Sequence, residues 1–334
     1  MIIIQRMDTP KVLPRHVEAA LVHALDAMPA VVLTGARQTG KSTLVQSRTP
    51  DRLYLTLDDL DVLDQASRAP DDLLGRARRM TIDEVQRHPA LLRGVKRAID
   101  ARRTKGRFVL TGSANLLIMR QVSESLAGRA SYLTLWPLTR REQLGMGRAG
   151  IWEELLATRD EDWLDLVAAQ TVDHEDWRAL ARRGGYPTPA VHMHTDEARE
   201  TWFAGYIRTY LERDLQEISS ITALPDLRRL MRAACHRLGQ MVNQTELGRD
   251  VALPQATVHR YLNLLETSYQ LVRVPAYAVN RTKRLIKTPK LYWADTGVAL
   301  HLTDESTPTG AHLENLILGD LLTCLLYTSP SPRD

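Results

Sequence analysis

The feature that most constrains this chain is an eight-residue loop, Gly35-Ala36-Arg37-Gln38-Thr39-Gly40-Lys41-Ser42. A short apolar run with two β-branched residues precedes the loop at 31–33, and residues 43–46 after it favour a helix. In this glycine-rich order, successive backbone N–H groups can point at phosphate oxygens. A helix that starts directly after the loop adds its free N-terminal donors and the positive end of its dipole. The segment therefore predicts a phosphate-binding loop between a strand and a helix.

The chemistry of this loop indicates ATP and Mg²⁺ as its ligands. Lys41 is expected to reach the β- and γ-phosphates, and the Ser42 hydroxyl to ligate Mg²⁺. Both residues stand where such a loop places its lysine and its hydroxyl. The predicted nucleotide-binding residues are Gly35, Ala36, Arg37, Gln38, Thr39, Gly40, Lys41, Ser42 and Thr43.

A second polar element, Asp83-Glu84, follows the apolar residues 80–82. Alone, such a pair is more often the solvated start of a helix. After a phosphate loop it fits the needs of Mg-nucleotide chemistry, so we expect Asp83 to bind the Mg²⁺ shell and Glu84 to polarise the attacking water.

Two further residues complete the predicted catalytic set of Lys41, Glu84, Ser113 and Arg129. A third strand at 108–110 runs into a polar turn, which would place Thr111 or Ser113 beside the γ-phosphate. The alternative is an ordinary strand-to-helix turn that Ser113 caps. Arg129 is a candidate arginine finger, which neutralises charge on the transferring phosphoryl group. The alternative for Arg129 is a solvated or ion-paired side chain.

The periodicity of the first 139 residues predicts an α/β fold. Apolar strand candidates at 31–33, 53–57, 80–82, 108–110 and 132–135 alternate with helical segments, of which the first spans 15–28. This alternation favours a parallel sheet with helices on both faces. From 140 to 225 helical patterns dominate, and three short helices then lead to an apolar stretch at 270–274.

Residues 243–290 form a candidate element for binding duplex DNA. A capping-box signature at 243–246 and Pro254 open two helices with helix-turn-helix spacing. A packing module between domains explains the same pattern equally well. The exposed face of the second helix would carry Ala256, Thr257, Arg260 and Asn263, and the basic residues of a following wing would be Arg281, Lys283, Arg284, Lys287 and Lys290.

Several segments together resemble one family, the AAA+-type P-loop ATPases of bacteria and archaea with a C-terminal domain of unknown function. They read TGARQTGKSTL, MTIDEVQ, FVLTGSANLL, SLAGRASYLTLWPLT, RRGGYPTPA and KTPKLYWADTGVAL. The resemblance implies an ATPase domain at 1–139, a helical lid at 140–225, a winged-helix-like domain at 226–278 and, from 279, the start of a nuclease-like domain. Nuclease carboxylates are absent downstream of 323, and Glu314 alone supports no nuclease.

We therefore expect Mg-dependent ATP hydrolysis that moves the lid and the C-terminal part, in the course of action on nucleic acid. The alternative is a nucleotide-gated DNA-binding regulator with negligible turnover. A finger supplied in trans by Arg129 would require a homo-oligomer. The charge of +4 arises mainly from arginine and does not identify a partner.

The sequence also predicts a soluble, cytoplasmic protein. No apolar run approaches the ~20 residues of a membrane helix. The last residues, CLLYTSPSPRD at 324–334, match the translation of a sequencing adapter, so we expect them not to belong to the protein and the natural C-terminus to be missing.

Overall fold

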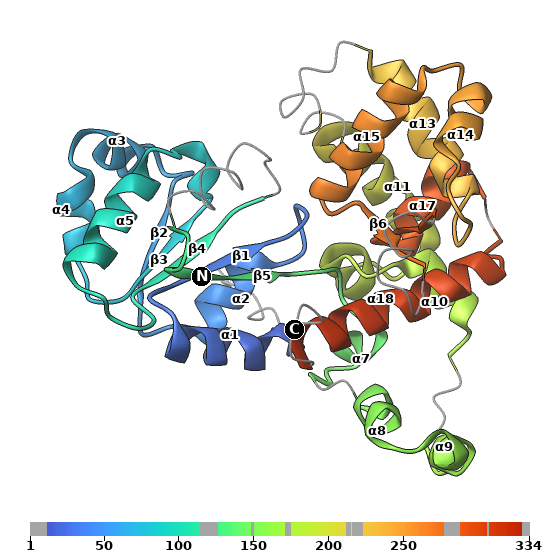
Figure 1. Cartoon of the computed structure of the whole chain (residues 1–334), viewed down its shortest axis with the longest axis horizontal. Helices are drawn as coiled ribbons and strands as arrows, with labels where there is room; N and C mark the ends of the chain where they lie inside the picture. The colour runs from blue at the N-terminus through green and yellow to red at the C-terminus, as the bar shows by residue number, and fades with distance from the viewer. Residues whose placement is uncertain are drawn as a thin grey trace, which may run out of the picture.

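The computed structural model describes residues 12–113, 126–147, 150–170, 175–211, 215, 223–276, 288–305 and 307–328. A five-stranded parallel sheet in the order β2-β3-β4-β1-β5 forms the N-terminal half (Figure 1). Its strands are β1 Ala30–Thr34, β2 Leu53–Thr56, β3 Met80–Asp83, β4 Phe108–Thr111 and β5 Ala130–Thr134. The five predicted strands and the α/β fold class are thus confirmed.

Helices cover both faces of this sheet, because alternate residues of each buried strand face opposite sides. Val31 and Leu33 of β1 pack with α1 and α2, whereas Ala30 and Val32 pack with α3, α4 and α5 (Figure 1). These helices are α1 Val17–Ala27, α2 Lys41–Arg48, α3 Leu60–Arg68, α4 Pro70–Gly75 and α5 Leu91–Ala101, and the 3₁₀ turn η1 spans Val85–Arg87.

The rest of the described chain is mainly helical. A connecting part holds α7 Arg140–Gln143, α8 Ile151–Ala157, η2 Asp160–Asp162 and α9 Trp163–Ala168. We call the part after it, from Glu175 to Thr303, the C-terminal module. The module contains α10 Trp177–Arg183, η3 Thr188–His192, α11 Asp196–Tyr206, η4 Ile207–Leu211, α13 Leu224–His236, α14 Gln244–Asp250, α15 Gln255–Thr267, β6 Leu271–Val274, β7 Lys290–Trp293 and α17 Thr296–Thr303.

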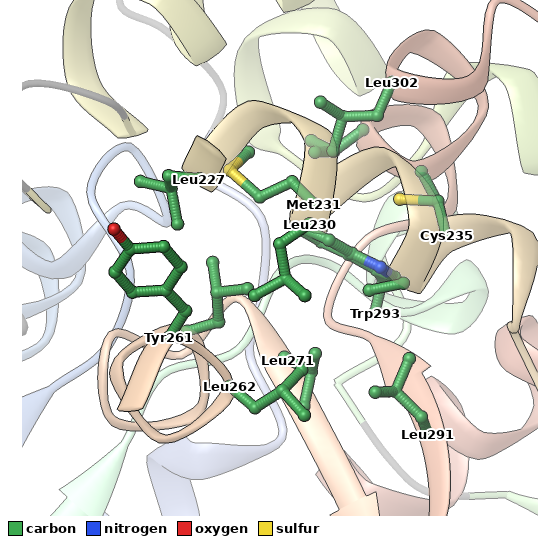
Figure 2. Packing of buried hydrophobic residues seen from close by; sticks show 14 of the residues in the cluster. Leu227, Leu230, Met231, Cys235, Tyr261, Leu262, Leu271, Leu291, Trp293 and Leu302 are labelled. Carbon is green, nitrogen blue, oxygen red and sulfur yellow. The ribbon is translucent and has the colours of Figure 1, made fainter. Parts of the chain in front are cut away.

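One apolar core unites the module. Side chains of α13, including Leu230 and Met231, pack with Leu262 of α15 and with Leu291 of β7 (Figure 2). The same cluster takes in Phe203 of α11, so the predicted lid helices share a core with the three predicted short helices. β6 and β7 pair antiparallel.

The last helix, α18 Gly310–Thr328, runs from the C-terminal module towards α1 (Figure 1). It continues through the buried Cys324, the first residue of the segment expected to be foreign. Within the described residues, no helix is long and apolar enough to cross a membrane.

A buried ion pair joins the start of the chain to the segment that follows the sheet. The Arg15 guanidinium lies 3.2 Å from the Glu142 carboxylate, and both side chains are buried. Glu142 also accepts hydrogen bonds from the backbone N–H groups of His16 and Thr139. Because these donors satisfy the carboxylate, the pair fixes α1 relative to α7 despite the cost of burying charge.

We predict that Glu142→Ala destabilises the fold by about 3 to 5 kcal/mol, since it leaves the buried Arg15 uncompensated. The measurement is urea unfolding of the purified chain. Glu154→Ala, at an exposed position of α8, is the matched control and should change stability by no more than about 0.5 kcal/mol. Equal stability of the two variants would contradict the role of the ion pair.

Candidate functional site

The predicted phosphate loop links β1 to α2, and its backbone requires glycine at two points. Gly35 has φ 145°, and a Cβ there would lie 2.3 Å from the Leu135 carbonyl oxygen at the end of β5. Gly40 has φ 91° and occupies the N-cap position of α2. Gln38, between them, is also left-handed, with φ 65°. The loop therefore curls tightly against the sheet, as phosphate binding by its N–H groups requires.

Lys41 lies buried at the base of this loop. Its Nζ donates to the carbonyls of Ala36 at 2.8 Å and Gly35 at 3.2 Å. The Thr39 hydroxyl donates to the Ala36 carbonyl at 3.0 Å, so the loop is braced from within. The ammonium is thereby held inside the curl of the loop, where phosphate oxygens would bind.

Asp83, at the carboxyl end of β3, is buried and held by two hydroxyl groups. Thr111 at the end of β4 donates to Oδ1, and the Tyr54 hydroxyl of β2 donates to Oδ2 at 2.5 Å. Burial and the Asp83 carboxylate raise the pKa of Tyr54 to about 12, while hydrogen bonds to Gln46 and Ser42 oppose the shift. The structure thus brings Ser42 and Asp83 together around the Tyr54 hydroxyl. The sequence did not predict Tyr54 as a site residue, because it stands in an apolar strand.

Glu84 follows β3 in a left-handed conformation, with φ 56° and ψ 42°. Its pKa is raised, chiefly by burial and then by the adjacent Asp83 charge, while Lys41 opposes the shift. A general base acts in its deprotonated form. As pH falls, Glu84 becomes protonated when the pH passes through its raised pKa, and it then can no longer accept a proton. This loss occurs at a higher pH than for an exposed glutamate.

Ser113 lies in the same network as Glu84. The Gln86 amide donates to the Glu84 carboxylate and, at 3.0 Å, to the Ser113 hydroxyl. Gln86 was not predicted as a site residue, although it is the last letter of the DEVQ segment. The turn after β4 is thus connected to the candidate base through a side-chain amide.

Arg129 is not brought to this site. It lies directly before β5, and its carbonyl accepts from the Ala30 N–H at 3.1 Å, at the start of β1. At ~3.3 Å per residue, the five residue steps from Ala30 to Gly35 place it about 17 Å from the phosphate loop. Its guanidinium pairs with Asp100 at 2.6 Å. Within one chain, Arg129 is therefore an ion-paired residue at the amino-terminal ends of the strands, opposite the phosphate loop.

The donor set suits Mg²⁺ held partly by a nucleotide. Mg²⁺ usually binds through one or two protein oxygens, several waters and substrate phosphates. Ser42 and Asp83 supply such oxygens, and no group of three or more His, Cys, Asp or Glu side chains that could hold a metal occurs in the described ranges. The predicted ligands therefore fit this ion.

The C-terminal module contacts the phosphate loop directly. Ala36 belongs to the apolar cluster of the module. The Tyr269 hydroxyl, in the turn after α15, lies 2.8 Å from the hydroxyl of Thr34, the residue before the loop. Since the Thr34 hydroxyl donates to the Leu133 carbonyl, Tyr269 is the donor in this pair. Arg15 holds the loop from a third side by donating to the Thr39 carbonyl at 2.9 Å.

A second junction lies at the segment 184–187. The buried Asp295 accepts from the Gly185 N–H at 2.6 Å and caps α17 through the Val298 N–H at 2.9 Å. A Cβ at Gly185 would lie 2.5 Å from the Leu138 carbonyl oxygen, so only glycine allows this approach. The module is thereby fixed to the segment after β5.

Comparison with known proteins gives two family matches. Residues 27–144 match the family described as an AAA domain, and residues 174–309 match a domain of unknown function, DUF8612. Uncharacterized proteins of Mycobacterium bovis and Mycobacterium tuberculosis are each 31% identical over 329 residues, which is 95% of this chain and 67% of theirs. A Walker-type ATPase structure from Pyrococcus abyssi aligns over 87% of this chain and 96% of its own, with 16% identity and a TM-score of 0.46.

We predict that Thr111→Val lowers the free energy of unfolding by about 1.5 to 3 kcal/mol, because it removes a hydrogen bond to the charged Asp83. Thr81→Val is the matched control. Thr81 lies buried on β3, and its hydroxyl finds no hydrogen-bond partner among the described residues. Chemical denaturation should show no loss for Thr81→Val. A loss of the same size in both variants would exclude a specific role for the Asp83 contact.

Proposed function

This chain belongs to a family of AAA-type P-loop ATPases that carry a C-terminal domain of unknown function, and we propose that it binds and hydrolyses Mg-ATP. The observation that carries the proposal is the meeting of Lys41, Ser42, Asp83 and Glu84 at the carboxyl ends of β1 and β3. Ligands of parallel α/β sheets bind at this edge. Because ATP and Mg²⁺ are abundant in the cytoplasm, we propose that location.

In this proposal, the N–H groups of residues 35–43 bind the phosphates and Lys41 turns from the loop carbonyls to the β- and γ-phosphate oxygens. Ser42 and Asp83 would hold Mg²⁺, which neutralises charge on the phosphate oxygens. Glu84 accepts a proton from the attacking water, and burial, which raises its pKa, makes it a stronger base than an exposed glutamate. Gln86 orients Glu84 and connects it to Ser113, which can sense the γ-phosphate.

We further propose that the nucleotide state moves the C-terminal module relative to the sheet. The support is the contact of Ala36 and Thr34 with the module, the latter through Tyr269. A cavity of about 230 Å³ lies between Trp136, Trp177 and α18, so part of the junction is not close-packed. Because Ala36 and Thr34 contact the module, a displacement of the loop by phosphate would act directly on the module. The cavity leaves space for the module to move in response.

The role of Arg129 as a finger remains a proposal that needs a second copy of the chain. Arg129 lies at the edge of the sheet opposite its own phosphate loop, so it can only act on the site of a neighbour. A homo-oligomer in the ATP-bound state is therefore part of this proposal.

A second candidate function is a nucleotide-gated regulator that binds duplex DNA through residues 243–290. It is favoured by α15, whose residues Ala256 and Arg260 are exposed. Asn263 of the predicted recognition face is instead bonded to Arg273, and Lys290 pairs with Glu314 at 2.7 Å. The other wing residues, Arg281, Lys283, Arg284 and Lys287, lie outside the described residues.

We predict that Lys41→Ala abolishes nucleotide binding and that Glu84→Gln binds Mg-ATP without hydrolysing it. Calorimetry measures binding and phosphate release measures turnover. Loss of a general base typically costs 10²- to 10⁴-fold in rate. Normal turnover by Glu84→Gln would remove the assigned base, and tight binding without turnover in the native chain would favour the regulator.

We predict that Tyr269→Phe weakens the response of the C-terminal module to nucleotide. Loss of one hydrogen bond of about 0.5 to 1.5 kcal/mol changes a coupling roughly two- to tenfold. The readout is limited proteolysis with and without a non-hydrolysable ATP analogue. Tyr292→Phe is the control, because it removes a tyrosine hydroxyl that bonds Glu314 within the C-terminal region. Identical nucleotide-dependent protection in both variants and the native chain would contradict coupling through Tyr269.

A further inference from the structure

The amino-terminal edge of the sheet, opposite the phosphate loop, concentrates positive charge. Four of the five strands directly follow an arginine: Arg52, Arg79, Arg107 and Arg129. The segments 50–52, 75–79, 100–107 and 127–129 before these strands contain nine Arg or Lys residues and two acidic residues, Asp51 and Asp100, and the segment 26–29 before β1 adds a third, Asp26. Since the whole chain has a net charge of +4, the rest of the molecule is net negative.

These segments are tied to one another, so the cations sit on a braced surface. Arg52 donates from both terminal nitrogens to the Gly106 carbonyl, at 2.7 and 2.6 Å. Arg103 donates to the Gly128 carbonyl at 2.9 Å. The backbone continues the connection, because the Met80 N–H donates to the Arg107 carbonyl at 2.9 Å.

Two of these three acidic residues are already neutralised. Asp51 pairs with Arg79 at 2.8 Å and Asp100 with Arg129 at 2.6 Å. Arg129, Lys96 and Arg103 together lower the pKa of Asp100, as expected where cations surround one carboxylate. Five exposed cations remain that have no acidic partner in the described part of the chain, and we call them the basic edge: Arg76, Arg78, Arg102, Arg103 and Lys105.

The chemistry of the basic edge suits a phosphodiester backbone. Its segments expose no large apolar side chain, whereas protein interfaces have an apolar centre and membrane-surface elements carry apolar anchors. Four of its five cations are arginines, whose planar guanidinium matches phosphate oxygens. The five cations precede the neighbouring strands β3 and β4, so they form one cluster that can face consecutive phosphates, which are ~3.4 Å apart along one strand.

We propose that the basic edge binds the sugar–phosphate backbone of nucleic acid without sequence preference. This site is separate from residues 243–290 and from the nucleotide site at the other end of the strands. The inference does not depend on ATP hydrolysis. The edge leaves the phosphate loop free, so both ligands can bind at once.

The test is fluorescence anisotropy of a labelled mixed-sequence 24-base-pair DNA duplex with the intact chain at 50 and 200 mM salt. Each phosphate contact contributes about 0.9 to the slope of log affinity against log salt. We expect the double variant Arg102→Gln, Lys105→Gln to bind at least tenfold more weakly at 50 mM, with a slope smaller by about 1.8. These exposed side chains make no described contact that holds the fold, and the melting temperature checks this.

The matched control is Arg159→Gln, Arg178→Gln, which removes two exposed cations that lie outside both the basic edge and residues 243–290. It should bind duplex like the native chain. Absence of duplex binding at 50 mM salt would overturn the proposal, and so would a loss confined to the control variant. Tighter binding to anionic phospholipid vesicles or polyglutamate than to duplex or single-stranded DNA would assign the edge to another partner and equally overturn it.

Discussion

The phosphate loop is held by groups from outside its own strand and helix, and the other features of the site depend on this. Gly35 closes against the end of β5, and Ala36 is buried in the core of the C-terminal module. Arg15 binds the Thr39 carbonyl, while its charge is balanced by Glu142. A loop with neighbours in three parts of the fold cannot change shape alone, because packed interiors transmit small displacements.

The parts of the fold that the sequence predicted are those encoded by local patterns. Short apolar runs gave the five strands, and the order of residues 35–42 gave the loop, because both signals lie within a few neighbouring residues. Tyr54 and Tyr269 could not be predicted in the same way. Tyr269 is 235 residues from Thr34 in the chain, and a tyrosine inside or after an apolar stretch is indistinguishable from a core residue until the strands are placed.

Arg129 shows where local reasoning stops. It directly precedes β5, but which end of the sheet it occupies depends on the parallel topology. In a parallel sheet all residues before strands gather at one edge and all residues after strands at the other. The same rule explains both surfaces of the domain: Asp83 and Thr111 follow strands and build the nucleotide edge, whereas the arginines before strands build the basic edge.

The central claim is that nucleotide bound to residues 35–43 is sensed by the C-terminal module. Amide hydrogen exchange of the intact chain, with and without a non-hydrolysable Mg-ATP analogue, tests both halves of that claim. It predicts slower exchange in residues 35–46 together with altered exchange in residues 268–274. Unchanged exchange in the loop would contradict nucleotide binding there, and a change confined to the loop would contradict its transmission to the module.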